Sequence, residues 1–186
     1  MGKTSIFNPA QQANSVSSKV VAAVERLSAS FRVLLWNEAK QHGLSPIQVQ
    51  LLVFLLHYPE EKRTVTHLAH YFNMTKATIS DAIKSLESKQ LITRKIMESD
   101  TRSHSLHLVK EGKTLARKVE RYAMPMLDAV AGLPAENQAV LLENLLQLIY
   151  QLNQTGVVTP QTMCLNCHFY TRKNGGHYCN LVKAPL

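Results

Sequence analysis

Apolar residues recur every three or four positions over most of the chain, which is typical of amphipathic helices. The first such stripe begins after Ser15 and consists of Val20, Val24, Leu27, Phe31 and Leu34. Gly43 is suited to end this helix, because glycine readily takes the left-handed backbone conformation that follows a helix. Ser45-Pro46 predicts the start of a second helix, and Tyr58-Pro59 ends it.

Two shorter helices follow. Thr64 or Thr66 starts the first, Asn73-Met74 forms a tight break, and Thr75 caps the next helix. The apolar positions of this last helix recur at helical spacing and should point inward; they are Ile79, Ala82, Ile83 and Leu86. The two helices and the break between them resemble a helix-turn-helix.

The character of the chain changes after Gln90. Residues 91–97 and 104–109 alternate between apolar and polar, and the charged segment 98–103 separates them. This alternation predicts two strands joined by an exposed loop. Helix, turn, helix and hairpin are the parts of a winged helix-turn-helix, in which the second helix enters the major groove of DNA. The sequence therefore predicts a mainly α fold with a small β-hairpin wing, and a DNA-binding domain over residues 44–110.

Helical periodicity returns over residues 111–126, where Pro125 should kink or break the helix. A last helix starts at Leu133-Pro134 and has an apolar face wider than a lone surface helix requires. This face is formed by Leu141, Leu142, Leu145, Leu146, Leu148, Ile149 and Leu152. Gly156 and Pro160 mark a linker to a tail of different composition, residues 160–186. Residues 1–14 are polar, and we expect them to be flexible.

Composition narrows the class of protein. The longest apolar run, residues 51–56, is far shorter than the roughly 18 residues of a membrane-spanning helix. The first dozen residues contain no apolar core of a secretory signal, so a cytoplasmic protein without membrane contact is expected. All three cysteines lie in the last 25 residues of the 186-residue chain. An odd, clustered set argues against a disulfide framework and favours metal or redox chemistry.

Charge points to nucleic acid as the partner. The net charge is +8, and residues 61–120 hold twelve lysines and arginines against seven acidic residues, so most of the surplus lies in the predicted DNA-binding segment. The candidate DNA contacts lie around the start and outer face of the second helix of the motif and along the hairpin. They are Thr75, Lys76, Thr78, Ser80, Lys84, Arg94, Lys95 and Arg102.

These residues carry a resemblance to a known family. Leu44 to Gln48, the segment 68–91, Asp100-Thr101-Arg102 and Leu106 to Val109 with Gly112 look like the MarR family of bacterial regulators. The resemblance implies a homodimeric transcription factor on a pseudo-palindromic operator, often a repressor released by a small-molecule effector or by oxidation. It also implies that Arg102 is the wing-tip arginine and that Asp100 braces the wing. Residues 15–43 and 111–153 would form the helical dimerisation region.

The tail suggests a metal-binding hairpin. Cys164 and Cys167 form a Cys-x2-Cys knuckle, and a turn at Asn174-Gly175 would bring His177 and Cys179 back towards it. Three thiolates and one imidazole suit tetrahedral Zn²⁺, and His168 is the competing fourth ligand. The same cysteines could instead hold an iron–sulfur cluster or form a reversible disulfide, and the Cys-x2-Cys-His string also matches haem attachment. The MarR resemblance does not extend to this tail.

The sequence bears on two other function classes. An enzyme is not expected, because no His-Glu-x-x-His, Gly-x-Ser-x-Gly, P-loop, dinucleotide-binding or deaminase signature occurs. A helix-turn-helix used only for protein interaction is the remaining alternative. Two further histidine pairs, His67 with His70 and His104 with His107, are read as surface or phosphate-facing residues and not as metal ligands.

Overall fold

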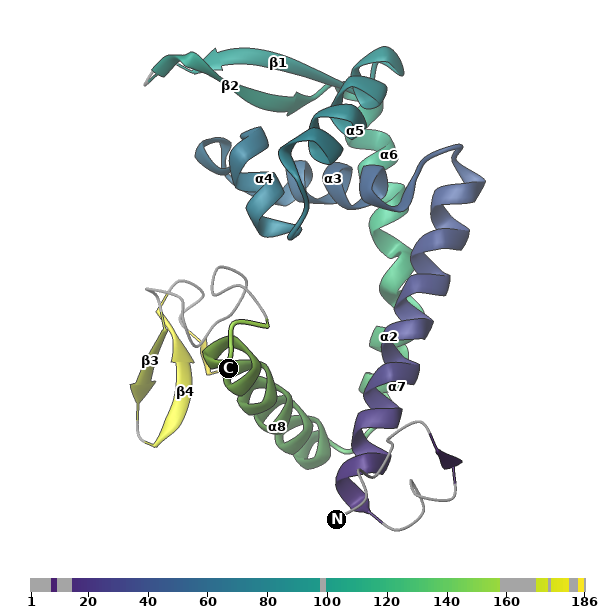
Figure 1. Cartoon of the computed structure of the whole chain (residues 1–186), viewed down its shortest axis with the longest axis vertical. Coiled ribbons are helices and arrows are strands. Elements are labelled where there is room, and N and C mark those ends of the chain that lie inside the picture. Colours follow the sequence, from purple (N-terminus) through teal and green to yellow (C-terminus); the bar gives the residue numbers. More distant parts are fainter. Residues whose placement is uncertain are drawn as a thin grey trace.

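The computed structural model describes residues 8–9, 15–97, 100–157, 170–173, 175–180 and 184–185 (Figure 1). In chain order its main elements are α2 (Val16–Gln41), α3 (Pro46–His57), η1 (Glu60–Lys62), α4 (Val65–Tyr71), α5 (Lys76–Ser88), β1 (Ile92–Met97), β2 (Asp100–Leu108), α6 (Lys110–Val119), η2 (Glu120–Ala123), α7 (Met124–Ala131), α8 (Ala135–Gln154), β3 (Tyr170–Lys173), β4 (Gly176–Cys179) and β5 (Ala184–Pro185). No helix among these residues is long and apolar enough to cross a membrane.

The hydrophobic core lies in the segment from α3 to α6. Leu51, Leu52 and Leu55 of α3 are buried, and they join Leu68 of α4 and Leu106 of β2 in one cluster. The inward-facing positions predicted for α5 are buried in the same cluster, namely Ile79, Ala82, Ile83 and Leu86. A mainly helical body with a two-stranded hairpin confirms the predicted winged helix-turn-helix.

Local capping interactions place the helix ends where the sequence predicts them. At the end of α2 the Gly43 and Leu44 amides donate to the carbonyls of Lys40 and Ala39, and Gly43 has a φ of +61°. This is the double hydrogen bond that ends many helices at a left-handed glycine. At the start of α3 the Ser45 hydroxyl accepts from the Gln48 amide, and the Gln48 side chain accepts from the Ser45 amide, which is a capping box.

The wing is a two-stranded antiparallel sheet. Thr93 pairs with His107 and Lys95 with Ser105, and the register shifts between Ile96 and Met97. The predicted loop 98–103 is therefore partly wrong, because β2 already begins at Asp100 and continues the pairing beyond that irregularity. Residues 98–99 lie outside the described residues. A one-sequence pattern cannot locate a register shift, since the shift depends on which residues pair across the strands.

The helical segment after the wing is interrupted as predicted. α6 ends at Val119, a 3-10 turn follows, and α7 carries Pro125 in its first turn. The break thus begins before the proline, which suits the first turn of a new helix because it has no amide proton to donate. Glu120 in the turn is hydrogen-bonded to His57 at the end of α3, with 2.6 Å between Oε2 and Nε2.

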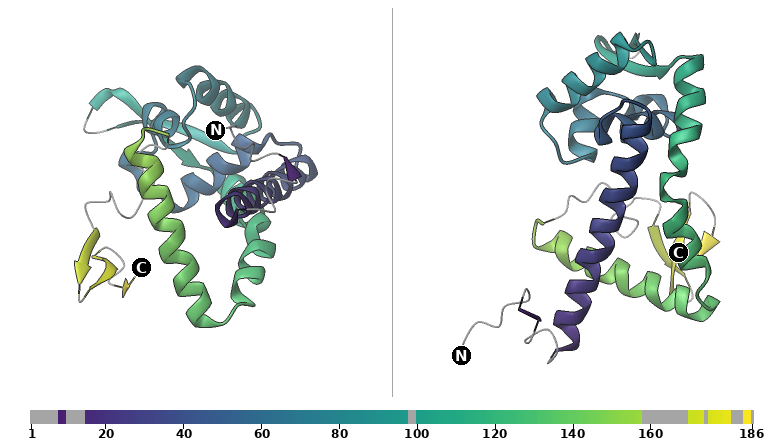
Figure 2. Two further views of the ribbon diagram at one scale, coloured as in Figure 1. Left: turned by 60° about the horizontal axis from the view of Figure 1, so that its bottom comes forward. Right: turned by 90° about the vertical axis from the view of Figure 1, so that its right-hand side faces the viewer.

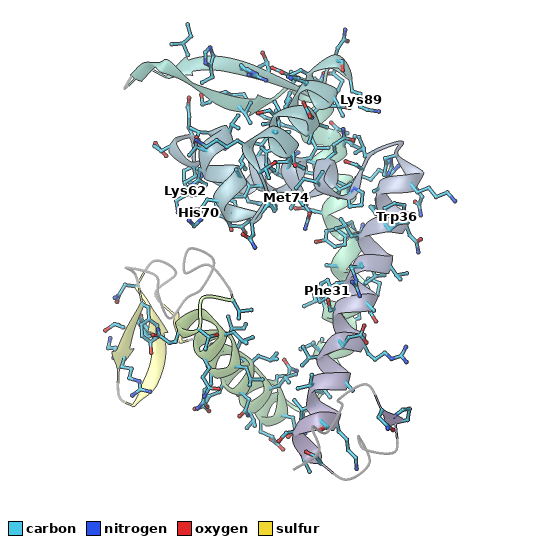
Figure 3. The ribbon with its side chains drawn as sticks, in the orientation of Figure 1. Phe31, Trp36, Lys62, His70, Met74 and Lys89 are labelled. Carbon is cyan, nitrogen blue, oxygen red and sulfur yellow. The ribbon has the colours of Figure 1, made fainter. Side chains whose placement is uncertain are left out.

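Three helices extend away from the winged domain. α2 contacts η2, and Val33 of α2 lines a pocket with Pro125 and Met126 at the start of α7; α8 leaves the end of α7 at an angle to both helices (Figures 1 and 2). The apolar stripe predicted on α2 stays exposed in the single chain: Val20, Val24, Leu27 and Phe31 are each between 43% and 49% exposed. Phe31 and Trp36 project from α2 into solvent (Figure 3). On α8, Leu141, Leu142, Leu148 and Leu152 are exposed as well. These stripes do not fill the core of one chain.

The tail contains the predicted hairpin. β3 pairs with β4 in an antiparallel sheet, and Gly175 between them has a φ of +80°, as the Asn-Gly signal predicts. A third strand, β5, pairs with β4 and was not predicted. The expected flexible segment, residues 1–14, lies outside the described residues except for Asn8 and Pro9.

Candidate nucleic-acid interface

The outer face of α5 presents the predicted recognition residues to solvent. Lys76, Thr78 and Lys84 are exposed, as is the capping residue Thr75, and Ser80 is half-buried. Opposite them lie the buried apolar positions of the same helix. α5 therefore separates into an apolar inner face and a polar outer face that carries donors and positive charge.

The first turn of α5 is fixed by Thr75. Its Oγ1 accepts a hydrogen bond from the Thr78 amide at 3.1 Å, and the two threonine hydroxyls are 2.9 Å apart. Such a cap satisfies one of the free amides at the helix start and leaves the hydroxyl of Thr78 at the exposed tip. The start of a helix is also the end that attracts anions, including phosphate groups.

Asp81 and Lys84 form an ion pair on the exposed face of α5, with 3.3 Å between Oδ1 and Nζ. Both side chains are at least 70% exposed, so the pair contributes little to stability and Lys84 can leave it for another anion. Asp81 opposes a polyanion, which agrees with leaving this residue out of the candidate DNA contacts.

The three hairpin residues have different surroundings. Arg94 makes a double hydrogen bond to Glu87 of α5, with its Nε 2.9 Å from Oε1 and its second nitrogen 3.0 Å from Oε2. This pair fastens the wing to α5, and its DNA contact stays a prediction. Lys95 is on the other face of the wing. Arg102 lies in β2, but its side chain is outside the described part of the chain, so its role also stays a prediction.

Sequence reasoning missed a second group of cations. Arg63, Lys113 and Arg117 line a pocket of about 430 Å³ together with Lys95. The four-residue spacing of Lys113 and Arg117 signals that they share one face of a helix. Nothing in the sequence shows that Arg63, about 50 residues earlier, lies beside them.

Two of the histidines described as surface residues are half-buried. His67 is half-buried, with its ring centre 6.0 Å from that of Phe54, and burial lowers its pKa. The side chain of His107 is only 17% exposed, and its Nε2 is 2.8 Å from the Ser105 hydroxyl and 3.2 Å from Glu60. Neighbouring side chains therefore cover part of each ring, and neither histidine is as exposed as expected. His70 and His104 are exposed, as predicted.

The side chains of the predicted metal ligands all lie outside the described part of the tail. Cys164, Cys167 and the competing His168 lie outside the described residues. His177 and Cys179 occupy alternate positions of β4, and their side chains are not described. Elsewhere in the described ranges, no three histidine, cysteine or acidic side chains gather closely enough to hold a metal ion. The zinc site stays a prediction.

Comparisons with known proteins agree with the geometry. Residues 42–103 match the model of the MarR family. The fold is similar to a Staphylococcus aureus MepR–DNA complex, at 22% identity, 71% coverage of this chain, 97% of that chain and a TM-score of 0.62. Streptococcus pneumoniae FabT in complex with DNA is similar at 24% identity, 73% and 99% coverage and a TM-score of 0.60.

A structure of Staphylococcus aureus MepR bound to ethidium bromide is similar at 22% identity, 71% and 95% coverage and a TM-score of 0.50. A comparison with curated proteins gives no match. The three structures share the fold over 71% to 73% of this chain, and the family model matches the helix-turn-helix and part of the wing. Residues 42–103 therefore form a segment that matches the MarR family, and the chain folds as a winged helix-turn-helix.

Proposed function

We propose that the protein is a transcriptional regulator that binds double-stranded DNA through α5 and the wing, and that it acts without enzymatic activity. The observation that carries this proposal is the exposed polar face of α5, capped at Thr75 and bearing Lys76 and Lys84. A MarR-family domain and similarity to two DNA complexes support it.

The chemistry of this face suits the major groove. The short side chains of Thr75, Thr78 and Ser80 let the start of α5 approach base edges, where hydroxyls can both donate and accept hydrogen bonds. Lys76 and Lys84 would neutralise the flanking phosphates. Arg102 at the wing would reach the neighbouring backbone or minor groove, and the Arg94–Glu87 pair holds the wing at a fixed angle to α5.

The active species in this proposal is a homodimer. Exposed apolar stripes on α2 and α8 supply the self-complementary surface that a two-fold interface needs. Two recognition helices would then read an inverted repeat, and a bound dimer that overlaps a promoter would repress transcription. The MepR structure with ethidium supports a small-molecule effector as a further partner.

The salt dependence of DNA binding tests the proposal. Duplexes selected from a random-sequence library should converge on an inverted repeat, and affinity measured by fluorescence anisotropy should fall steeply with salt. Lys76→Gln with Lys84→Gln should reduce the slope of log K against log salt by about four for each bound dimer, because two lysines are lost from each of its two protomers. Lys19→Gln with Lys40→Gln, which removes two charges from α2, should leave the slope unchanged. A flat salt response would favour the alternative, a helix-turn-helix that binds only proteins.

For the tail we propose a structural Zn²⁺ site formed by Cys164, Cys167, His177 and Cys179. The β3–β4 hairpin supports it, because its turn returns the chain so that β4, with its histidine and cysteine, runs beside the strand that follows the knuckle. Soft sulfur and imidazole donors match the preference of zinc. A short tail with few apolar residues also needs such a cross-link to hold one structure.

Elemental analysis with a visible spectrum tests the tail. Purified protein should contain one zinc per chain and be colourless, whether prepared with or without oxygen. His177→Ala should lose the zinc and His168→Ala should keep it, which separates the two candidate fourth ligands. A brown protein with iron and sulfide would establish the iron–sulfur alternative, and metal-free protein with a reversible Cys164–Cys167 disulfide would establish the redox alternative.

A further inference from the structure

A pocket of about 430 Å³ lies behind the wing, on the side away from the outer face of α5. Its walls come from the end of α3, from the loop after η1, from both strands of the wing and from α6. Leu55 and Leu56 of α3 provide an apolar part of the lining. Segments as far apart in the sequence as Leu55 and Arg117 therefore meet around one cavity.

The polar part of the lining is strongly cationic. Arg63, Lys95, Lys113 and Arg117 all line the pocket, and no acidic residue does. Within the described ranges, none of these four side chains forms an ion pair with a carboxylate. Four unpaired positive charges around one cavity repel one another, so a bound anion would stabilise the arrangement.

One of the cations is held by a hydrogen bond, and two others share one face of a helix. Arg63 donates from Nε to the carbonyl of Tyr58 at 2.7 Å, which fixes the guanidinium and leaves its terminal nitrogens to a ligand. Lys113 and Arg117 are one helical turn apart on α6, so both can approach one anionic group. Planar guanidinium groups also suit the oxygens of carboxylates, sulfonates and phosphates.

Glu60, an acidic side chain beside the pocket residue His107, is already hydrogen-bonded. Glu60 accepts a hydrogen bond from the Ser105 hydroxyl at 2.8 Å and lies 3.2 Å from Nε2 of His107. The hydrogen bond from Ser105 lowers the pKa of Glu60, with a smaller contribution from Lys95. The carboxylate of Glu60 is therefore engaged with Ser105 and His107 of the wing. Most of the positive charge of the pocket stays without a neighbouring negative charge.

The register of the wing shows which side the pocket occupies. Thr93 and Lys95 are paired with His107 and Ser105, and residues paired directly across two strands share one face of the sheet. Arg94 lies on the opposite face, where it contacts Glu87 of α5. The cations of the pocket are thus separated by the sheet from the helix that we propose reads DNA.

We propose that this pocket binds a small organic anion, one with a carboxylate, sulfonate or phosphate group held by Arg63, Lys95, Lys113 and Arg117 and an apolar body resting on Leu55 and Leu56. The proposal concerns binding of a small molecule and does not depend on whether the protein reads DNA. A ligand there would touch β1 of the wing and α6 at once.

Two fluorescent probes with the same aromatic skeleton test the charge requirement. 8-Anilinonaphthalene-1-sulfonate carries an anionic group, and N-phenyl-1-naphthylamine lacks it. Lys113→Gln with Arg117→Gln should weaken binding of the sulfonate by roughly ten-fold and leave binding of the neutral probe within about two-fold. Lys118→Gln with Arg121→Gln removes two exposed charges from the same region outside the pocket and should change neither affinity.

The remaining outcomes overturn the proposal. Equal loss of both probes would mean a general apolar surface, and equal loss of the sulfonate in the two double variants would mean unspecific charge attraction. If the Lys113 and Arg117 variant lowers the salt slope of DNA binding instead, these residues contact DNA phosphates. Should that variant not fold, as judged by circular dichroism, Lys95→Gln on the exposed strand carries the same expectation with a smaller loss, and unchanged sulfonate binding there counts against the site.

Discussion

At the residue scale, single side chains serve both the fold and the proposed interface. Thr75 caps α5 and lies at its exposed tip, so the residue that starts the helix also stands where DNA would be read. Arg94 has the charge of a DNA contact but is engaged with Glu87. Sequence patterns supply the charge of a residue and its place on a helix or strand. They do not show which nearby side chain already uses that charge.

Arg102, the proposed wing-tip arginine, allows a test that separates DNA binding from stability. Arg102→Ala should weaken binding to the selected duplex by about five-fold, because one charge-assisted phosphate or base contact is lost. The midpoint of urea unfolding and the dimer should stay unchanged. Fluorescence anisotropy and urea titration of the two proteins check this, and unchanged DNA affinity would remove Arg102 from the contact list.

The Arg94–Glu87 pair should act mainly on the fold. Its bidentate geometry and partial exposure place its coupling free energy near the upper end for surface ion pairs, about 1 kcal/mol. A double-mutant cycle with Glu87→Gln, Arg94→Gln and both changes together, followed by urea unfolding, measures this coupling. A coupling near zero would show that the wing is fastened to α5 by its buried apolar residues alone.

At the scale of elements, the helices, their caps and the two strands follow from local sequence. Capping and turn residues act within a few positions, so Gly43, Ser45, Thr75 and Gly175 could all be placed in advance. The close approach between α6 and the segment before β1 could not be predicted from local sequence. A Cβ on Gly112 would lie 1.9 Å from the carbonyl oxygen of Leu91, a contact between residues that only the folded chain brings together.

This close approach makes Gly112 a sensitive position. Gly112→Ala should destabilise the protein by about 2–3 kcal/mol, because a backbone carbonyl must move to admit the methyl group. Gly43→Ala is the matched control: nothing lies within 4 Å of the added Cβ, so only the positive φ of +61° opposes it, at about 1 kcal/mol. Urea unfolding of both variants gives the comparison. Equal losses would mean that α6 shifts freely away from Leu91.

At the scale of the whole molecule, sequence could not decide where the apolar stripes of α2 and α8 are buried. Both a monomer core and an interface between copies satisfy the same helical spacing. The structure excludes the first for these stripes, since Val20, Leu27, Phe31 and Leu148 remain exposed in one chain. The cationic pocket shows the same limit, because Arg63, Lys95 and Arg117 meet only through the packing of three elements.

The exposed stripe of α2 gives the prediction that belongs to this scale. The protein should be a homodimer in solution, because exposed apolar side chains along two helices are unfavourable in water and gain about 25 cal/mol for each Å² covered. Leu27→Asp places a charge in the middle of the stripe and should shift the protein to monomer at micromolar concentration. Ser28→Asp, on the next residue of the same helix, should leave the dimer intact.

Sedimentation velocity over a range of concentrations measures both effects. Circular dichroism shows whether the Leu27 variant keeps its helices, since some dimers have no stable monomer. If the Leu27 variant is unfolded at a concentration where the wild type is a folded dimer, folding depends on association through this stripe. A wild-type protein that sediments as a 20.9 kDa monomer at every concentration would contradict the dimer. The two apolar helices would then be available to a different partner, and the binding of a dimer to an inverted-repeat operator would lose its structural basis.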